Sequence, residues 1–476
     1  MKPTELSKGS RYVILAAAFL GWMFSGIQMT VMNLASGTAT EEFARSGLVA
    51  KDVSLHFSGL AASPRMPSAT IGTTPLPAGG DLKKLKNSWY SYFNSAFLLG
   101  AALGGLMFGW IADWSGRVRA MGASILCYSL FAGAGYLAAT PEQLLLLRFL
   151  SGMGVGGMWP TGVSLAAEAW SDVSRPALAG LLGASANLGI VLLSAITWFV
   201  TLETESWRWV MLVGLAPAVV GVLVLFVVPE SPAWLQTRGD AKQGPKPGAL
   251  RSLFSPPLLP VTLLGIALGT IPLFGGWGVT SWVIPWTEHE SQQQQEGENQ
   301  ASALPGSAKV AQTPEQKKAV SQARALTAIM RASGGALGSL FGGWIANLLG
   351  RRLTYFLISL CSFGLSEFIY LCLHPLWPGF SIAVFAIGCV STVFFGWLPL
   401  YLPELFPTHA RATGAGISFN FGRILTAAGV LGTGTILAYV GGNFRYAGGL
   451  MSLIYACGML VILFAPDTTK NRVGSA

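Results

Sequence analysis

The sequence predicts an all-α membrane protein with twelve transmembrane helices, arranged as two six-helix repeats. Hydrophobic residues make up 52% of the 476 positions and charged residues only 11%, which excludes an ordinary water-soluble protein. A motif between two apolar runs then occurs twice. Gly109-Trp-Ile-Ala-Asp113-Trp-Ser-Gly116-Arg117 returns 234 positions later as Gly343-Trp-Ile-Ala-Asn347-Leu-Leu-Gly350-Arg351. Such a repeat indicates an internal duplication.

A second set of matches supports the duplication. Glu168, Arg175 and Gly180 return 236 positions later, with the same internal spacing, as Glu404, Arg411 and Gly416. Each half of the chain therefore carries the same landmarks in the same order.

Twelve apolar runs reach the roughly 20 residues that a bilayer requires. They lie at 12–36, 90–111, 120–139, 143–167, 177–201, 208–228, 258–283, 325–348, 353–373, 379–401, 413–439 and 446–465. These runs define a first half at 1–228, a linker at 229–257 and a second half at 258–476. Two polar segments, 37–87 and 288–322, take matching places between the first two runs of each half. We expect no regular fold in either and interpret both as external spacers.

The basic residues of the short loops set the orientation. Arg117, Arg175, Arg351 and Arg411 all fall on the side of the N-terminus, as do the basic residues of the linker. Because basic loops stay in the cytoplasm, we expect both termini to be cytoplasmic. The net charge of +9 is therefore interpreted as topology, and we expect no nucleic-acid partner.

The sequence shows no pattern typical of a metal site, a phosphate loop or a catalytic nucleophile. The five cysteines lie within apolar runs and no pair has metal-ligand spacing. They are Cys127, Cys361, Cys372, Cys389 and Cys457. We expect neither metal nor cofactor, and no enzymatic activity.

The repeated motif is a candidate for a cytoplasmic gate. Gly105 and Gly109 are small residues four apart, which favours close helix approach, and Gly116 allows a tight turn. The Asp113 carboxylate can pair with an arginine or meet the positive N-terminus of a neighbouring helix. We expect these groups to hold the cytoplasmic side closed. The predicted gate comprises Gly109, Asp113, Gly116, Arg117, Glu168, Arg175, Glu404 and Arg411.

Three segments resemble the major facilitator superfamily. The motif at 109–117 matches the family's signature between spans two and three, and Arg148-x-x-x-Gly152-x-Gly154-x-Gly156 resembles its second signature. Pro229-Glu230-Ser231-Pro232-Ala233-Trp234-Leu235 resembles the conserved loop of its sugar and metabolite porters. The resemblance implies the major facilitator fold, secondary transport by alternating access, a monomer, and a bacterial plasma (inner) membrane.

Three arginines inside the apolar runs point to the solute. Each costs about 2.5–3.5 kcal/mol in a membrane and therefore marks a partner or a pathway. Arg331 and Arg423 stand near mid-span with few acids to offset them, so we interpret the missing partner as an anionic cargo, with Asn420 adding a neutral hydrogen bond. Packing between helices is the alternative. For Arg148 a structural or gating role is favoured over substrate contact.

Polar groups elsewhere complete the predicted site. Gln28 and Asn33 in the first run either line the cavity or form interhelical hydrogen bonds. Glu367, in the outer part of the ninth run, is the one evident buried carboxyl for proton coupling, with Arg148 as a second candidate. The seventh run carries Pro272 and several glycines, which predict a broken helix and a gate. Trp286 is expected in the aromatic belt at the outer surface.

Ser418-Phe-Asn420-Phe-Gly422-Arg423 resembles the eleventh span of sialate and carboxylate proton symporters. This resemblance implies a small organic anion, such as a carboxylate, as the transported partner, with proton symport possible in principle. A sugar or other metabolite porter, or a non-transporting nutrient sensor of the same fold, are the alternatives. The fifth and seventh spans lack the glutamines typical of sugar porters.

Overall fold

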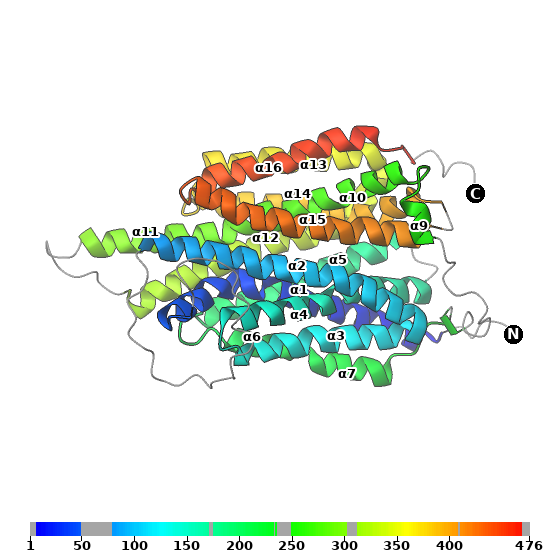
Figure 1. Ribbon diagram of the computed structural model, residues 1–476, viewed down its shortest axis with the longest axis horizontal. Coiled ribbons are helices and arrows are strands. Elements are labelled where there is room, and N and C mark those ends of the chain that lie inside the picture. Colours follow the sequence, from blue (N-terminus) through cyan, green and yellow to red (C-terminus); the bar gives the residue numbers. More distant parts are fainter. Residues whose placement is uncertain are drawn as a thin grey trace.

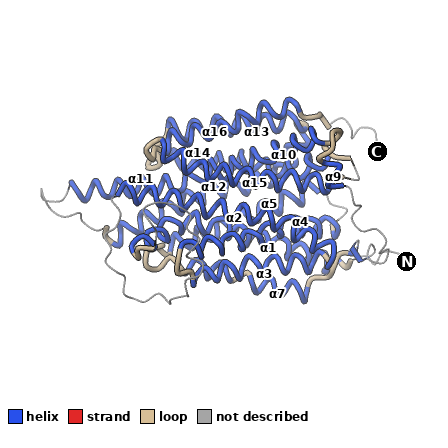
Figure 2. Tube along the Cα trace, viewed as in Figure 1, coloured by secondary structure: helices blue, strands red, loops and turns tan. Residues whose placement is uncertain are grey.

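The architecture is known from a computed structural model, which describes residues 6–48, 79–170, 175–232, 234–235, 249–301, 312–407 and 410–468. Within these residues the chain forms helices joined by turns, and no strand occurs among them (Figures 1 and 2). The expectation of an all-α fold is confirmed.

The first half contains six transmembrane stretches, the last of them broken in two. Its helices are α1 (Lys8–Arg45), α2 (Gly79–Ser115), α3 (Arg117–Ala134), α4 (Pro141–Ala169), α5 (Arg175–Phe199), α6 (Trp209–Leu215) and α7 (Ala218–Val227). A 3-10 turn, η2 (Gly135–Leu137), extends α3. Pro217 stands between α6 and α7, where a helix cannot continue its hydrogen bonds undisturbed.

The second half repeats this order. Its helices are α10 (Leu259–Phe274), α11 (Val283–Ala301), α12 (Pro314–Leu349), α13 (Arg351–Glu367), α14 (Pro378–Glu404), α15 (Arg411–Tyr439) and α16 (Phe444–Val461). A short helix, α9 (Ala249–Leu253), precedes them. Two π-helical turns, η3 (Gly275–Val279) and η5 (Phe368–Cys372), and two 3-10 turns, η4 (Thr280–Trp282) and η6 (Ile462–Phe464), complete the half.

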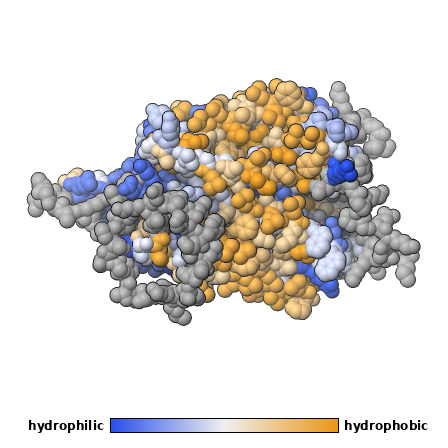
Figure 3. Space-filling model, viewed as in Figure 1, coloured by the Kyte–Doolittle hydropathy of each residue, from blue (hydrophilic) through white to orange (hydrophobic). Residues whose placement is uncertain are grey.

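Ten of these stretches have the length and hydropathy needed to cross a membrane. The two other predicted spans, α4 and α12, are also long, but their glycines and the charged side chains of Arg148, Arg324 and Arg331 make them more polar. On the face that Figure 3 shows, apolar residues cover the middle of the molecule, and more polar residues lie towards its two ends. We call the end where α1 begins and α16 finishes the inner end, and the opposite end the outer end.

The two halves lie side by side, the first below the second in Figure 1. Within the first half α2 and α3 pack on α4, and α1 packs on α5. In the second half α12 packs on α14, and α13 on α16. The halves meet along two seams, α2 against α15 and α5 against α12. A solute site between the halves must therefore be built from these four helices and their neighbours.

Close packing within each half depends on matched glycines. A Cβ atom at Gly104 of α2 would collide with the carbonyl oxygen of Met153, and one at Gly338 of α12 would collide with that of Cys389. The two glycines are 234 positions apart, the offset of the repeated motif. The duplication is thus visible in the helix contacts as well as in the sequence.

Three sequence-based expectations change with the structure. The segment 288–322 was expected to lack regular structure, yet α11 continues to Ala301 and α12 begins at Pro314, because its Gln- and Glu-rich sequence is compatible with helix. Likewise, α1 continues to Arg45 and α2 begins at Gly79, within 37–87. The placement of Trp286 in a surface belt was wrong: its side chain is buried and stacks on Tyr370.

The predicted break in the seventh span is confirmed. After Pro272 the helix α10 passes into the π-helical turn η3 at Gly275 and then into the 3-10 turn η4. Thr280 and Ser281 donate their hydroxyl protons to the carbonyl oxygen of Gly276, at 3.1 and 2.7 Å. These side chains satisfy a backbone acceptor where the regular ladder is interrupted.

Candidate functional site

The repeated motif forms an ion network at the inner end of the first half. Arg117 Nη1 lies 2.5 Å from Asp113 Oδ1, and Arg117 Nε lies 3.6 Å from Glu168 Oε1. The Ser231 hydroxyl donates to the other oxygen of Glu168. The α2–α3 turn, the end of α4 and the segment after α7 are therefore joined. Gly116 permits the turn with a φ of 111°.

The second half carries the corresponding network. Arg351 donates from Nη2 and Nε to the two oxygens of Glu404, at 2.9 and 3.1 Å. Its Nη1 donates to Asn347 Oδ1 at 3.0 Å, so the neutral amide keeps the contact that Asp113 makes in the first half. Thr468 donates to Glu404 at 2.6 Å, as Ser231 does to Glu168.

Glu230 is a residue of this network whose role the sequence did not reveal. Its carboxylate accepts hydrogen bonds from the backbone N–H groups of Arg117 and Val118, at 2.9 and 3.2 Å. These are the first amides of α3, where the helix dipole favours a negative charge. Asp113 was expected to pair with an arginine or meet a helix N-terminus; it does the former, and Glu230 does the latter.

A sequence signal for this arrangement was present. Pro229-Glu230-Ser231 returns 237 positions later as Pro466-Asp467-Thr468, directly after the last span of each half. Both hydroxyls bind the glutamate at the end of the fourth span of their half. The duplication thus extends beyond the membrane helices.

Other members of the predicted gate show fewer contacts in the described part of the structure. A Cβ atom at Gly109 would meet no atom within 4 Å, so this glycine is not needed for close approach, whereas one at Gly105 would lie 2.6 Å from Asn420 Oδ1. Arg411 is exposed at the start of α15. The side chain of Arg175 lies outside the described part of the structure. The observed ion pairs of the motif join elements of one half only.

Contacts between the halves near the middle of the two seams come from other residues. Arg423 Nη1 donates to the carbonyl oxygen of Ala101, at 2.9 Å, and to Asn420 Oδ1, at 3.2 Å. The guanidinium also lies 4.8 Å from the ring of Phe419. Arg423 and Asn420 therefore share a face, as expected, but in this conformation they bind α2. Along the other seam, Asn187 donates to the Ser339 hydroxyl at 3.4 Å.

Arg148 is buried in the first half. Its Nη2 donates to the backbone oxygen of Gln28 at 3.1 Å, and its guanidinium lies 4.4 Å from the ring of Phe97. Phe97 in turn packs on Trp277 of η3, with ring centroids 5.7 Å apart. The Nε and Nη1 atoms of Arg148 have no hydrogen-bond partner in the described residues. In the described part of the chain, Phe97 and Trp277 therefore connect Arg148 to the second half.

Arg331 takes the place in the second half that Phe97 takes in the first. The two positions are 234 residues apart, and a Cβ atom at Gly152 or Gly388 would collide with the backbone oxygen of Phe97 or Arg331, respectively. Each half therefore has a cationic side chain at this level, supplied by α4 in one and by α12 in the other. Arg331 retains some accessible surface, whereas Arg148 is 2% exposed.

One tyrosine from each half interacts with Arg331. Its guanidinium interacts electrostatically with Tyr90 of α2 and Tyr455 of α16, both of which are buried. Tyr90 donates to the backbone oxygen of Ser281 at 3.4 Å, and the Tyr455 hydroxyl has no partner in the described residues. Among those residues no carboxylate pairs with Arg331. Neither tyrosine was predicted from the sequence, because nothing in their spacing links them to α12.

The observed contacts of the remaining predicted site residues stay within one half. Gln28 Nε2 donates to the backbone oxygen of Gly214 at 2.8 Å, which favours its interhelical role. Asn33 is 6% exposed, and its Oδ1 lacks a partner in the described part of the chain. Glu367, half-buried at the end of α13, accepts a hydrogen bond from Ser452 of α16. Neither Gln28 nor Glu367 is brought to Arg331 by the contacts seen.

Two six-helix halves, with buried cations at their interface and ion networks at one end, define a multi-pass membrane transporter. Residues 13–246 match the family described as sugar (and other) transporter, and residues 316–476 match the Major Facilitator Superfamily. The chain belongs to the major facilitator superfamily.

The chain has low sequence identity to two transport proteins that it resembles over most of their length. A cis,cis-muconate transport protein of Acinetobacter baylyi is 27% identical over 379 residues, which cover 78% of this chain and 83% of the relative. An inner membrane metabolite transport protein of Escherichia coli is 28% identical over 386 residues, covering 78% and 81%. The fold matches a partially occluded, inward-open xylose transporter from E. coli, with a TM-score of 0.67 and 16% identity over 97% of this chain and 99% of that one.

Proposed function

We propose that this transporter moves a small organic anion, a carboxylate, by alternating access of its two halves, and that Arg331 receives the anion. The observation that supports the proposal is the environment of Arg331. A guanidinium in the middle of α12, with no acidic partner among the described residues, is costly unless an anion visits it.

The groups around Arg331 suit a carboxylate. The guanidinium offers a planar fork of donors, and the hydroxyl of Tyr455 can donate one more hydrogen bond. Tyr90 comes from the first half, while Arg331 and Tyr455 come from the second. A solute bound here would therefore touch both halves, as alternating access requires.

The Tyr455 hydroxyl also faces Gly275, where a Cβ atom would lie close to it. Gly275 begins the π-helical turn η3, so the proposed site adjoins the break in the seventh span. Irregular backbone inside a membrane is tolerated where it lines protein or a cavity. This neighbourhood supports a role for the seventh span as a gate.

The naming of a relative supports the solute class. Muconate, which the Acinetobacter relative is named for, is a dicarboxylate. By analogy with the inner membrane relative, we also propose that this protein lies in the plasma membrane with its termini in the cytoplasm. Proton coupling is proposed through Glu367, whose partner Ser452 lies on the adjacent helix.

The test is uptake into proteoliposomes of labelled mono- and dicarboxylates, sialic acid and neutral sugars, with and without an inward proton gradient. We expect wild-type protein to take up a carboxylate, and Arg331→Gln to lose that uptake by at least about 30-fold, because truncating a buried charge pair costs about 2–5 kcal/mol. Arg331→Lys should retain part of the uptake.

Arg324→Gln is the matched control. Arg324 lies seven residues before Arg331 on the same helix, but it already pairs with Glu288 at 3.2 Å. Its loss should change the amount of folded protein and leave the preference for carboxylates intact. Sugar uptake that survives Arg331→Gln would refute the anion site. Solute binding without counterflow would favour the nutrient sensor.

A further inference from the structure

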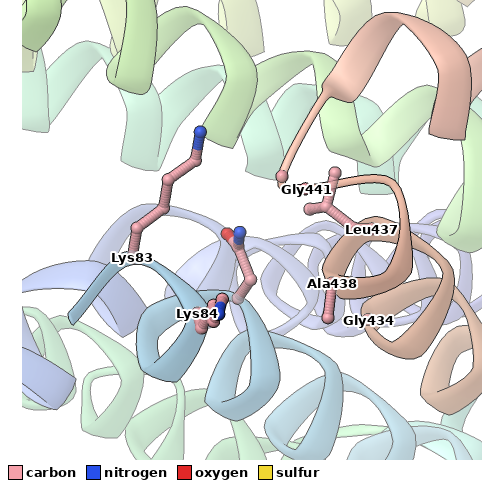
Figure 4. A pocket seen from close by; sticks show the side chains of 8 residues that line it. Lys83, Lys84, Gly434, Leu437, Ala438 and Gly441 are labelled. Atoms are coloured by element: carbon pink, nitrogen blue, oxygen red, sulfur yellow. The ribbon is translucent and has the colours of Figure 1, made fainter. Parts of the chain in front are cut away.

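The outer end of the molecule carries a contact between the halves that the proposed function does not use. Lys83 of α2 places its Nζ 2.7 Å from Nε2 of His289 on α11. In Figure 4 the Lys83 side chain extends away from α2, beside a pocket of about 100 Å³ that lies between α2 and the α15–α16 turn. Lys83 belongs to the first half and His289 to the second.

With Lys83 as an ammonium, the chemistry of the two groups sets the protonation of the histidine. A lysine ammonium carries three donors and no acceptor. A hydrogen bond from Lys83 to Nε2 therefore requires that Nε2 accept, so the imidazole is neutral with its proton on Nδ1. Once His289 is protonated it cannot accept, and two cations then lie side by side.

The surroundings leave Lys83 as the main charge that faces His289. On its own helix, Glu288 pairs with Arg324 at 3.2 Å, and Glu290 accepts from Trp286 and lies 3.1 Å from Nε2 of His374. Glu296 lies further along α11. From α16, Phe444 contributes a ring 5.8 Å from the imidazole, and Arg445 donates to backbone oxygens at the end of the ninth span.

The same groups line a larger open pocket of about 370 Å³ at the outer end, which includes Lys83, His289, His374 and Arg445. Water and protons from the outer side therefore reach the contact. The Lys83–His289 contact lies between helices of different halves. Protonation at this contact can therefore change the interaction between the halves.

We propose that Lys83 and His289 form an acid-sensitive latch, which holds the outer ends of the two halves together while His289 is neutral and releases them when it is protonated. The proposal rests on the proposed function in one respect, namely that the two halves move by alternating access. It depends neither on Arg331 nor on the identity of the solute. Its test measures a distance instead of transport, so its failure and that of the proposed function are distinguishable.

The experiment places spin labels at Lys84→Cys and Tyr439→Cys, exposed positions on the outer parts of α2 and α15, in full-length protein whose five native cysteines are replaced. Distances are measured in nanodiscs without solute between about pH 8 and about pH 3, because burial and the nearby charge of Lys83 lower the pKa of His289 to about 4. We expect the wild-type distribution to gain a longer component as the pH falls.

His289→Gln should remove this pH response, because the amide oxygen of glutamine accepts from Lys83 at every pH. Lys83→Met should give the longer distance at every pH. His374→Gln is the control, since His374 and its partner Glu290 both belong to the second half, and it should respond as wild type does. A wild-type distance that is independent of pH, or a response that persists in His289→Gln, would overturn the proposal.

Discussion

Arg423 of α15 donates a hydrogen bond to the carbonyl oxygen of Ala101 on α2, at 2.9 Å, and so joins the second half to the first near the middle of the seam. Ala101 offers a backbone acceptor, so the contact survives most substitutions on α2. In this conformation the guanidinium is occupied by protein. Contact between Arg423 and a solute therefore requires that the halves first separate.

Removal of this contact should open the inner end. A hydrogen bond to a charged group contributes about 1.5–3 kcal/mol, so Arg423→Gln is expected to raise the inner-open population by roughly tenfold or more. Spin labels would report a longer distance without any solute if placed at Trp114→Cys in the first half and at Phe254→Cys in the linker. Both positions are exposed, and the Phe254 ring packs on Phe421 of α15.

Asn420→Ala provides the comparison for Arg423→Gln, because it removes one acceptor and leaves the bond to Ala101 intact. Its distance distribution should lie close to that of wild type. If Arg423→Gln leaves the distance between the two spin labels unchanged but abolishes uptake, Arg423 would be assigned to the solute site, as predicted from the sequence.

Gly105 and Gly109 should differ sharply when replaced by alanine. A Cβ atom at Gly105 lies 2.6 Å from Asn420 Oδ1, whereas Gly109 has open space. Overpacking costs about 1–3 kcal/mol, so Gly105→Ala should hinder closure of the inner end and slow uptake several-fold. Gly109→Ala should transport as wild type does. Equal initial uptake rates for the two variants would contradict this account of the seam.

The two ion networks should differ in strength. Arg351 is 4% exposed and holds Glu404 with two hydrogen bonds, so Glu404→Gln should destabilise the protein by about 3–5 kcal/mol. The Asp113 side chain is 64% exposed, and an exposed pair contributes about 0–1 kcal/mol. Asp113→Asn should therefore barely change the melting temperature in detergent.

Uptake should be recorded alongside melting for both variants. An Asp113→Asn protein that melts normally but transports poorly would assign Asp113 to the transport cycle. A Glu404→Gln protein that melts as wild type does would show that the buried network contributes little to stability.

Glu230→Gln should loosen the start of α3. Loss of a negative cap at a helix N-terminus costs about 1–2 kcal/mol, which corresponds to roughly 5- to 30-fold faster hydrogen exchange at the amides of Arg117 and Val118. Glu142→Gln is the matched control, because Glu142 also lies in a first helical turn, but there Thr140 is the cap. Unchanged exchange at the two α3 amides would rule out capping by Glu230.

Much of the fold followed from the sequence because hydropathy and duplication are both local signals. Each predicted run corresponds to one helix or to successive helical segments, and the repeated motif marks the same turn twice, at Gly116 and Gly350. The helical extension to Ala301 was missed because its polar residues suggested a spacer, although glutamine and glutamate are good helix formers.

The site was predicted less completely, since it depends on which helices meet. Arg331 could be singled out as a charge in an apolar run, but its neighbours Tyr90 and Tyr455 stand 241 residues before it and 124 after it. In the same way, the role of Arg423 depends on a backbone carbonyl, which no side-chain pattern reveals.

The segment that follows α7 belongs to the first half, although it comes after the last helix in the membrane. Glu230 holds the beginning of α3, Ser231 holds Glu168, and Trp234 donates from its indole N–H to the carbonyl oxygen of Asp113. A chain cut at Val227 to express the two halves separately would lack all three of these contacts, whereas a cut beyond Leu235 would preserve them.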